Sequence, residues 1–147
     1  MLVRTIRKDL AIQRPERATP GSSGFDLKAW LPNGDVTLQP GKRAAISTGL
    51  AIHILDANTE GQIRSRSGLA LKHGVAVLNS PGTIDNDYRG DIKVILINHG
   101  TEPFVVTTGM RIAQLVFAEV RPQVTFDWAD SLEESKRGDG GFGHTGV

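Results

Sequence analysis

The chain has 147 residues, which is enough for one domain with its own hydrophobic core. Seventeen Lys and Arg against sixteen Asp and Glu give a net charge of +1, which excludes a generally basic surface for nucleic acid or membranes. The sequence has no cysteine, which excludes disulfides and thiolate metal sites, and no apolar run approaches the length of a membrane span. We therefore expect a soluble, cytoplasmic protein with no nucleic-acid or membrane partner.

Short apolar runs rich in valine and isoleucine are separated by glycine and proline along the chain. The runs lie at 44–54, 75–78, 92–97, 104–106 and 112–116. Many short strands bounded by turn residues are typical of an all-β sandwich or barrel. The run 92–97 (IKVILI) is nearly continuous in apolar residues, so we expect both of its faces to be buried. A capping box at 131–134 (SLEE) predicts a short helix of one or two turns.

The segment 64–68 (RSRSG) combines two arginines, two serines and a glycine. The guanidinium fork of Arg66 matches the oxygens of a phosphate, and the hydroxyl of Ser67 can donate to them. Gly68 would let backbone N–H groups approach an anion closely, and a helix beginning near Ser67 would add the positive end of its dipole. The segment therefore predicts either a phosphate site or an ordinary polar turn on the surface.

Two apolar runs flank Pro81-Gly82 in the segment 78–91 (LNSPGTIDNDYRGD), which favours a β-hairpin. Asn79 precedes the turn and carries an amide that both donates and accepts hydrogen bonds. This combination of donor and acceptor is the one needed to read the edge of a nucleotide base.

Three carboxylates, Asp85, Asp87 and Asp91, follow this turn. In an extended strand their side chains would share one face by alternation, and they cannot all be buried because unpaired charges are costly to desolvate. One carboxylate held beside a water molecule would be able to act as a general base. The alternative is a solvated acidic turn paired with Arg89, in which Tyr88 is only a half-buried hydrophobic side chain.

A polar residue, Gln114, interrupts the apolar strand predicted at 109–117 (GMRIAQLVF). A buried amide needs a hydrogen-bonding partner. The side chain therefore either faces outward, as strand alternation permits, or donates to a bound anion.

The segment 137–146 (RGDGGFGHTG) contains five glycines, one arginine and one phenylalanine. A glycine-rich segment costs conformational entropy to order, so it suits a lid that closes only over a ligand. In such a lid Arg137 would meet a phosphate and Phe142 would stack on a planar base; the alternative is an ordinary disordered end. We predict a β domain at 1–136 followed by a flexible arm at 137–147.

Taken together, five segments resemble, in order, the five motifs of the homotrimeric dUTP pyrophosphatases, or dUTPases. They are GSSGFDLKA (21–29), RSGLALKHG (66–74), GTIDNDYRGD (82–91), GMRIAQLVF (109–117) and RGDGGFGHTG (137–146). The resemblance implies a jelly-roll-like β subunit in a homotrimer, with active sites shared between subunits and closed by the arm of one chain. It also implies hydrolysis of dUTP to dUMP and pyrophosphate with Mg²⁺ on the triphosphate, which limits uracil in DNA and supplies dUMP for thymidylate synthesis.

The resemblance further implies a role for individual residues. Asp85 would activate the water that attacks the α-phosphorus, and Tyr88 would lie under the deoxyribose and exclude a 2′-hydroxyl. Asp26 would support the site without acting in catalysis, and no side chain would ligate the metal directly. The other implied substrate contacts are Asn79, Thr83, Ile84 and Lys93 for uracil, Arg66, Ser67, Gly68 and Gln114 for phosphates, and Arg137, Phe142 and Gly143 in the arm.

Two other functions are compatible with the same fold. A dCTP deaminase would need a glutamate base near the cytosine ring, but residues 79–91 offer aspartates and no glutamate. A nucleotide-binding protein without catalysis would have no use for Asp85, Tyr88 and the arm together. Both alternatives are therefore weaker than dUTP hydrolysis.

Overall fold

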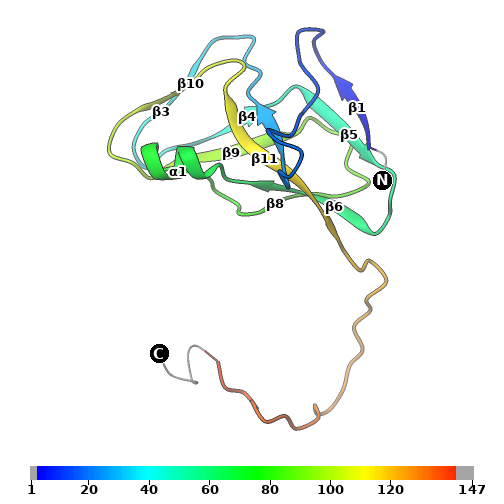
Figure 1. Cartoon of the computed structure of the whole chain (residues 1–147). Coiled ribbons are helices and arrows are strands. Elements are labelled where there is room, and N and C mark those ends of the chain that lie inside the picture. Colours follow the sequence, from blue (N-terminus) through cyan, green and yellow to red (C-terminus); the bar gives the residue numbers. More distant parts are fainter. Residues whose placement is uncertain (1–2, 142–147) are drawn as a thin grey trace.

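A computed structural model describes residues 3–141 of the chain, which form short β-strands and one helix (Figure 1). The helix is α1 (Ser67–His73). The strands are β1 (Val3–Arg7), β2 (Phe25–Lys28), β3 (Val36–Leu38), β4 (Arg43–Ser47), β5 (Leu50–Ile54), β6 (Thr59–Arg64), β7 (Val75–Val77), β8 (Gly82–Ile84), β9 (Lys93–Asn98), β10 (Phe104–Val106) and β11 (Arg111–Glu119). The architecture is mostly β, as the spacing of the apolar runs predicts.

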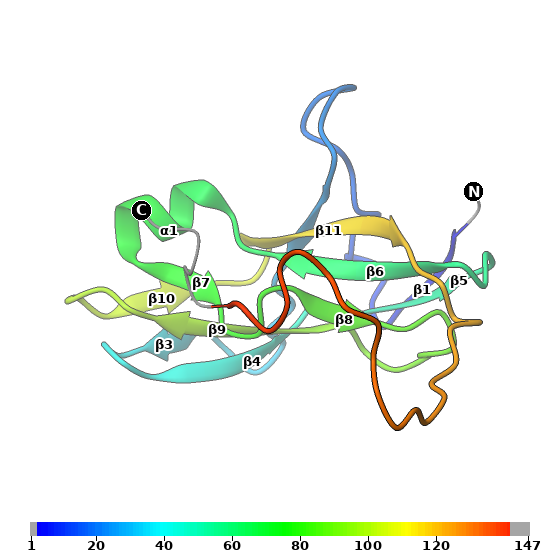
Figure 2. The same cartoon turned by 90° about the horizontal axis from the view of Figure 1, so that it is seen from below.

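The strands pair antiparallel in four groups that enclose one hydrophobic core. The largest sheet has the order β2-β11-β6-β8, and a second has the order β4-β9-β7. The remaining pairs are β1-β5 and β10-β3. Figure 2 shows β11, β6 and β8 lying side by side. Alternating burial places one side of each strand in the core; in β5, for example, Leu50, Ile52 and Ile54 are buried while the residues between them are partly exposed.

The run 92–97 is buried on one face rather than on two. In β9, Val94 and Leu96 are buried, whereas Ile95 and Ile97 are half-buried. Ile95 and Ile97 therefore point to the side of the β4-β9-β7 sheet that the chain itself covers only in part.

The predicted hairpin at Pro81-Gly82 is wrong, because its two flanking strands do not pair with each other. β7 pairs with β9, and β8 pairs with β6 in the other sheet. The Pro-Gly signal marks a reversal of the chain correctly but does not specify the pairing partner. The segment between β7 and β8 consequently passes from one sheet to the other.

A β-bulge interrupts the pairing of β11 with β2. Arg111 lies opposite Lys28 and Ala113 lies opposite Leu27, so Ile112 is the extra residue of β11. Both Ile112 and Ala113 are buried, which breaks the alternation at this point. Beyond the bulge, regular pairing resumes.

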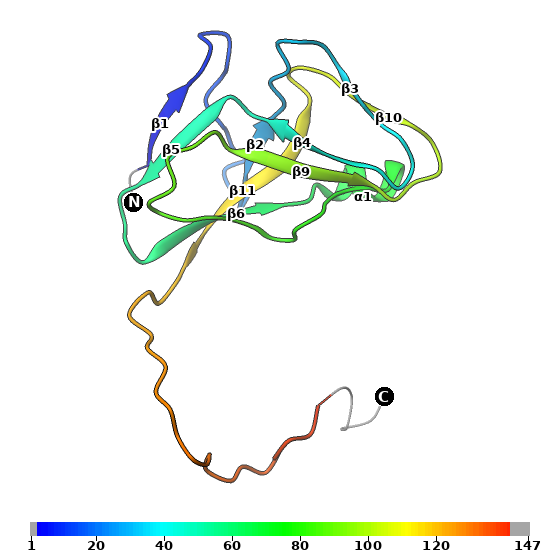
Figure 3. The ribbon, with the colours of Figure 1, turned by 180° about the vertical axis from the view of Figure 1, so that it is seen from behind.

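After β11 the chain leaves the sheets as a long extended segment that leads into the predicted arm (Figures 1 and 3). Residues 121–139 are exposed, and the capping box at 131–134 forms no helix. An isolated short helix is unstable without a packing partner, which explains its absence here. The division at residue 136 between domain and arm remains a prediction. None of the helices in the part of the chain that the structure describes is long and apolar enough to cross a membrane.

Candidate active site

Several of the predicted site residues line one cavity of about 410 Å³. Ile84 ends β8, Asp85 follows it directly, and Lys93 begins β9. The cavity is therefore formed where the chain crosses from the large sheet to the smaller one. Its lining residues are Ala45, Thr83, Ile84, Asp85, Tyr88, Asp91, Lys93 and Ile95.

A tight turn, rather than an extended strand, connects Asp85 to Tyr88. The backbone N–H of Tyr88 donates to the carbonyl oxygen of Asp85 at 3.1 Å. The three carboxylates therefore do not share one strand face, and Arg89 does not pair with any of them. Instead, Arg89 Nη1 donates to the carbonyl oxygens of Asn86 and Tyr88 at 2.6 and 3.0 Å.

The Tyr88 ring is held at its hydroxyl end. Its hydroxyl donates to the carbonyl oxygen of Asp91 at 3.0 Å. A Cβ atom built on Gly90 would lie 2.4 Å from that hydroxyl oxygen, so only glycine fits beneath the ring in this position. The ring thus forms one wall of the cavity that also contains the Asp85 carboxylate.

A second group of predicted residues surrounds Asp26 on the large sheet. The Asp26 carboxylate lies 3.5 Å from Arg66 Nε and 3.2 Å from Arg111 Nη1, with only 12% of the side chain exposed. Arg66 Nη1 also donates to the carbonyl oxygen of Arg111 at 2.9 Å. The Arg66 guanidinium is therefore held by a carboxylate and a carbonyl just before α1, and the Asp26 carboxylate is paired with two arginines.

The remaining members of this group follow from the strand register. Gln114 lies opposite Asp26 on β2 and opposite Arg64 on β6. Ser67 and Gly68 are exposed in the first turn of α1, directly after Arg66. The structure thus places Arg66, Ser67, Gly68 and Gln114 around one end of β6.

Two predicted residues lie apart from both groups. The Asn79 amide nitrogen is close to Gly82, since a Cβ atom built there would be 3.1 Å from it, but Asn79 does not line the cavity. Arg137 lies on the arm, where its Nε donates to the carbonyl oxygen of Gly140 at 2.8 Å. Phe142 and Gly143 lie outside the described residues.

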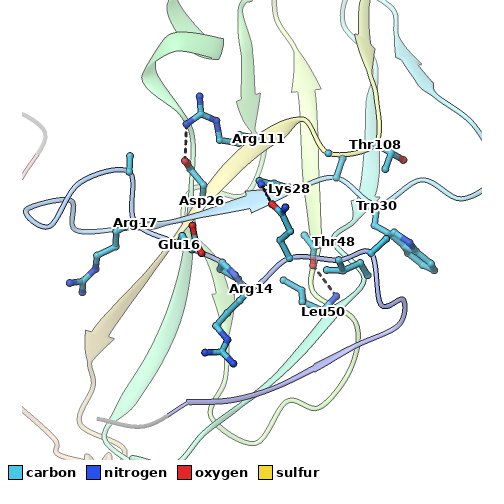
Figure 4. A pocket seen from close by; sticks show the side chains of 17 residues that line it. Arg14, Glu16, Arg17, Asp26, Lys28, Trp30, Thr48, Leu50, Thr108 and Arg111 are labelled. Atoms are coloured by element: carbon cyan, nitrogen blue, oxygen red, sulfur yellow. Dashed lines mark hydrogen bonds and ion pairs between the residues drawn. The ribbon is translucent and has the colours of Figure 1, made fainter.

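A larger cavity of about 540 Å³ opens beside Asp26 (Figure 4). It lies between the loop 11–18 and the strands β2 and β11, and the side chains of Arg14, Arg17, Lys28 and Arg111 contribute positive charge to its walls. Among the predicted site residues that the structure describes, Asp26 is the one that lines it. These four cationic residues do not line the cavity that contains Asp85, where Lys93 is the cationic residue of the wall.

Two residues lie at these sites without being predicted from the sequence: Arg111 pairs with Asp26, and Asp91 lines the cavity of Asp85. The partners of Arg111 are set by the β2–β11 register, and no local motif reports that register. The acidic cluster at 85–91 does indicate a functional site that includes Asp91. Its place in the cavity does not follow from the sequence, because residues 85–88 form a turn and not the predicted extended strand. The contacts of both residues depend on how distant strands pair, which only the structure shows.

Proteins of one family are similar in sequence to this chain. A family model described as dUTPase matches residues 11–146. The deoxyuridine 5′-triphosphate nucleotidohydrolase of Roseobacter denitrificans is 52% identical over 138 residues, covering 94% of this chain and 90% of that protein. The protein of the same name from Chlamydia pneumoniae is 53% identical over 133 residues, covering 90% of each.

A solved structure shares the fold. The dUTPase of Staphylococcus bacteriophage 80alpha, solved with dUPNHPP, aligns with a TM-score of 0.84 over 99% of each chain at 24% identity. This similarity confirms the predicted jelly-roll-like β fold. Together with the family match and the identity to the bacterial relatives, it establishes that this chain is a member of the dUTPase family of hydrolases.

Proposed function

We propose that the chain hydrolyses dUTP to dUMP and pyrophosphate at a site that includes the Asp85 cavity. The observation that carries the proposal is the presence of Asp85, Tyr88 and Lys93 in one cavity, in a chain whose family acts on nucleotides. In the cell this reaction would keep uracil out of DNA and supply dUMP for thymidylate synthesis.

In this mechanism Asp85 accepts a proton from a water molecule as the water oxygen attacks the α-phosphorus. The bond between that phosphorus and the oxygen leading to the β-phosphate breaks, and pyrophosphate leaves with the electron pair. Asp85 then returns its proton to solvent. Phosphoryl transfer needs little covalent help from the protein, so positioning and charge neutralisation supply most of the rate enhancement.

The group around Asp26 suits the triphosphate. Arg66 presents a guanidinium whose orientation is fixed by Asp26 and by the Arg111 carbonyl, and Ser67, Gly68 and Gln114 add donors nearby. Each charge-assisted hydrogen bond of this kind contributes roughly 1.5–3 kcal/mol. Because Asp26 is paired with two arginines, its role is to orient Arg66.

The residues also fit Mg²⁺ that enters on the substrate phosphates, which is a common way for proteins to hold this ion. Within residues 3–141, no three His, Cys, Asp or Glu side chains form a group suited to a metal. When bound, the ion would offset negative charge on the triphosphate. The chain itself contributes Arg66 and its neighbours to the same task.

Base and sugar recognition fall to the segment between β7 and β9. We assign uracil to the Asn79 amide and to the backbone of residues 83–85, with a further backbone contact from Lys93. Backbone groups can pair with the polar edge of uracil while leaving no room for a methyl group at C5. The Tyr88 ring would lie under the deoxyribose and exclude a 2′-hydroxyl.

We further propose a homotrimer, because one chain carries the parts of the site in separate places. The Asp85 cavity and the Arg66 group share no residue, and the chain after β11 extends away from the sheets (Figure 1). The segment between β11 and the arm also exposes alternate apolar side chains at Val124, Phe126 and Trp128, which are 62%, 99% and 100% exposed. Such alternation matches a strand that is half-buried against another surface. A neighbouring chain would supply that surface.

The homotrimer predicts that sedimentation will show about three subunits of 15.8 kDa. Replacing both Phe126 and Trp128 with serine should shift the protein towards the monomer, because the apolar area that these side chains would bury against the neighbouring chain would be lost. Leu10→Ser, which also removes an exposed apolar side chain, is the control. A double variant that sediments and hydrolyses dUTP like the wild type would show that these aromatics do not hold the assembly together.

Gly90→Ala is predicted to reduce kcat/KM for dUTP on the order of tenfold, since displacement of a positioning group by about an ångström costs that much or more. The added methyl would meet the Tyr88 hydroxyl and push the ring away from its place. Gly21→Ala is a matched control, because no atom lies within 4 Å of a Cβ built there. Equal kinetics for the two variants would argue against a role for the Tyr88 position.

The function as a whole is tested by measuring pyrophosphate release from dUTP, with dCTP and UTP as competing substrates and ammonia release as a second assay. Rapid release from dUTP alone is the expected result. Ammonia from dCTP would favour a deaminase, and binding without release from any nucleotide would favour a non-catalytic protein.

A further inference from the structure

The Asp91 carboxylate is almost completely buried beside the cavity that contains Asp85. Its side chain is 9% exposed, and Oδ2 lies 3.1 Å from Lys8 Nζ. The same oxygen accepts a hydrogen bond from Ser47 Oγ at 2.8 Å, while Oδ1 has no partner among the described residues. A buried carboxylate is strongly destabilised when its only counter-charge is removed. The position of Asp91 therefore depends on Lys8.

The backbone of Asp91 in turn fixes the Tyr88 ring. The Asp91 carbonyl accepts the Tyr88 hydroxyl at 3.0 Å. The next residue, Ile92, donates its N–H to the Leu50 carbonyl at 2.7 Å and accepts the Thr48 hydroxyl at 2.8 Å. The ring is thus attached to Asp91, which is followed by a rigid, buried stretch of backbone.

Lys8 reaches Asp91 from the N-terminal part of the chain. Strand β1 pairs with β5 over its whole length, as Figure 3 also shows. Directly after β1, the Lys8 N–H donates to the Gly49 carbonyl at 2.8 Å, which anchors its backbone on the turn between β4 and β5. Its Nζ lies 5.6 Å from the centre of a Trp30 ring. The backbone of Lys8 is therefore fixed at a position from which the ammonium group reaches Asp91.

We propose that Lys8 and Asp91 form a clamp that positions the Tyr88 ring, so that both are positioning residues for recognition of the deoxyribose. The inference rests on the proposed function of Tyr88 as the surface under the sugar. Without Lys8, the Asp91 carboxylate turns towards water to regain solvation. This movement works against the Ile92 N–H to Leu50 carbonyl bond that orients the Asp91–Ile92 peptide, so the Asp91 carbonyl tilts away from the Tyr88 hydroxyl. The ring is then free to move, and a 2′-hydroxyl is excluded less well.

The test compares Lys8→Met with Arg4→Met, which removes a positive charge from the same N-terminal segment. Arg4 makes no side-chain hydrogen bond or ion pair within residues 3–141, so it leaves the clamp intact. Lys8→Met should raise KM for dUTP on the order of tenfold, leave kcat within about twofold, and reduce the preference for dUTP over UTP by a similar factor. Lys8→Arg should restore both values, because it restores the charge.

A double-mutant cycle identifies the partner. Asp91→Asn leaves no buried charge without a partner, so Lys8→Met combined with Asp91→Asn should have a selectivity closer to the wild type than Lys8→Met alone, since the two residues act as a unit. Additive effects on KM would overturn the clamp. So would kinetics of Lys8→Met that match those of Arg4→Met.

Hydrogen exchange separates this inference from the proposed function. Lys8→Met, but not Arg4→Met, should speed amide exchange at residues 85–91, whether or not the protein hydrolyses dUTP. Unchanged exchange in that segment would overturn the clamp. If exchange increases but the wild-type protein releases no pyrophosphate from dUTP, the clamp stands and the proposed function fails.

Discussion

Replacing Asp85 with asparagine is expected to slow pyrophosphate release from dUTP by roughly 10²–10⁴-fold, the range that a positioned general base contributes. The amide has nearly the same shape but cannot accept a proton from water. Because Asp85 lies at the end of β8 and its side chain is exposed, the substitution should not disturb the core. Binding of dUPNHPP should therefore stay close to the wild-type value while turnover falls.

Asp87→Asn is the matched control for this experiment. Asp87 lies in the same turn and is exposed, but it does not line the cavity. It should keep turnover within a few-fold of the wild type. If Asp85→Asn turned over at the wild-type rate, another group would have to be the base.

Removal of the arm residues 137–147 should reduce turnover by on the order of 10²-fold or more, because closure over the substrate excludes water and completes the set of phosphate contacts. The core should be unaffected, since the last strand ends at Glu119 and residues 121–139 are exposed. Pyrophosphate release and thermal unfolding of the truncated protein measure the two effects separately.

Two further variants locate the source of the loss within the arm. Arg137→Ala should weaken dUTP binding more than dUMP binding, because its proposed partner is a terminal phosphate. Asp139→Ala, which removes an exposed acid from the same glycine-rich stretch, is the control. Full activity of the truncated protein would show that residues 137–147 have no part in catalysis.

The sequence predicted the class of fold because the strand signal is local. Apolar runs with β-branched residues between turn residues indicate strands wherever they occur, and β5 and β9 lie where such runs predict them. Strand pairing is not local, which is why the chain reversal at Pro81-Gly82 was recognised but joins two sheets instead of forming a hairpin. The burial of Ile95 and Ile97 was overestimated for a related reason, since composition does not reveal which side of a sheet the chain covers.

The part of the candidate site whose residues lie close together in one short segment was predictable from the sequence. Thr83, Ile84, Asp85 and Tyr88 fall within a few positions, and the structure brings them to one cavity. The supporting contacts were not predictable, because they join distant parts of the chain. Asp26 meets Arg66 and Arg111 through the pairing of three strands and the start of α1, and Lys8 meets Asp91 through β1 and β5. Side-chain chemistry can be read from sequence, but these pairings depend on register.

The bulge at Ile112 restricts how this protein can change in length. Deleting Ile112 would restore regular pairing between β11 and β2 with Arg111 still opposite Lys28, but it would remove a fully buried side chain from the core. Substitutions at Arg111 would instead leave Ile112 and Ala113 in the core and affect the Asp26 carboxylate. The exposed residues 129–136 are under no such constraint, so evolutionary insertions and deletions should accumulate there and be absent from residues 111–114.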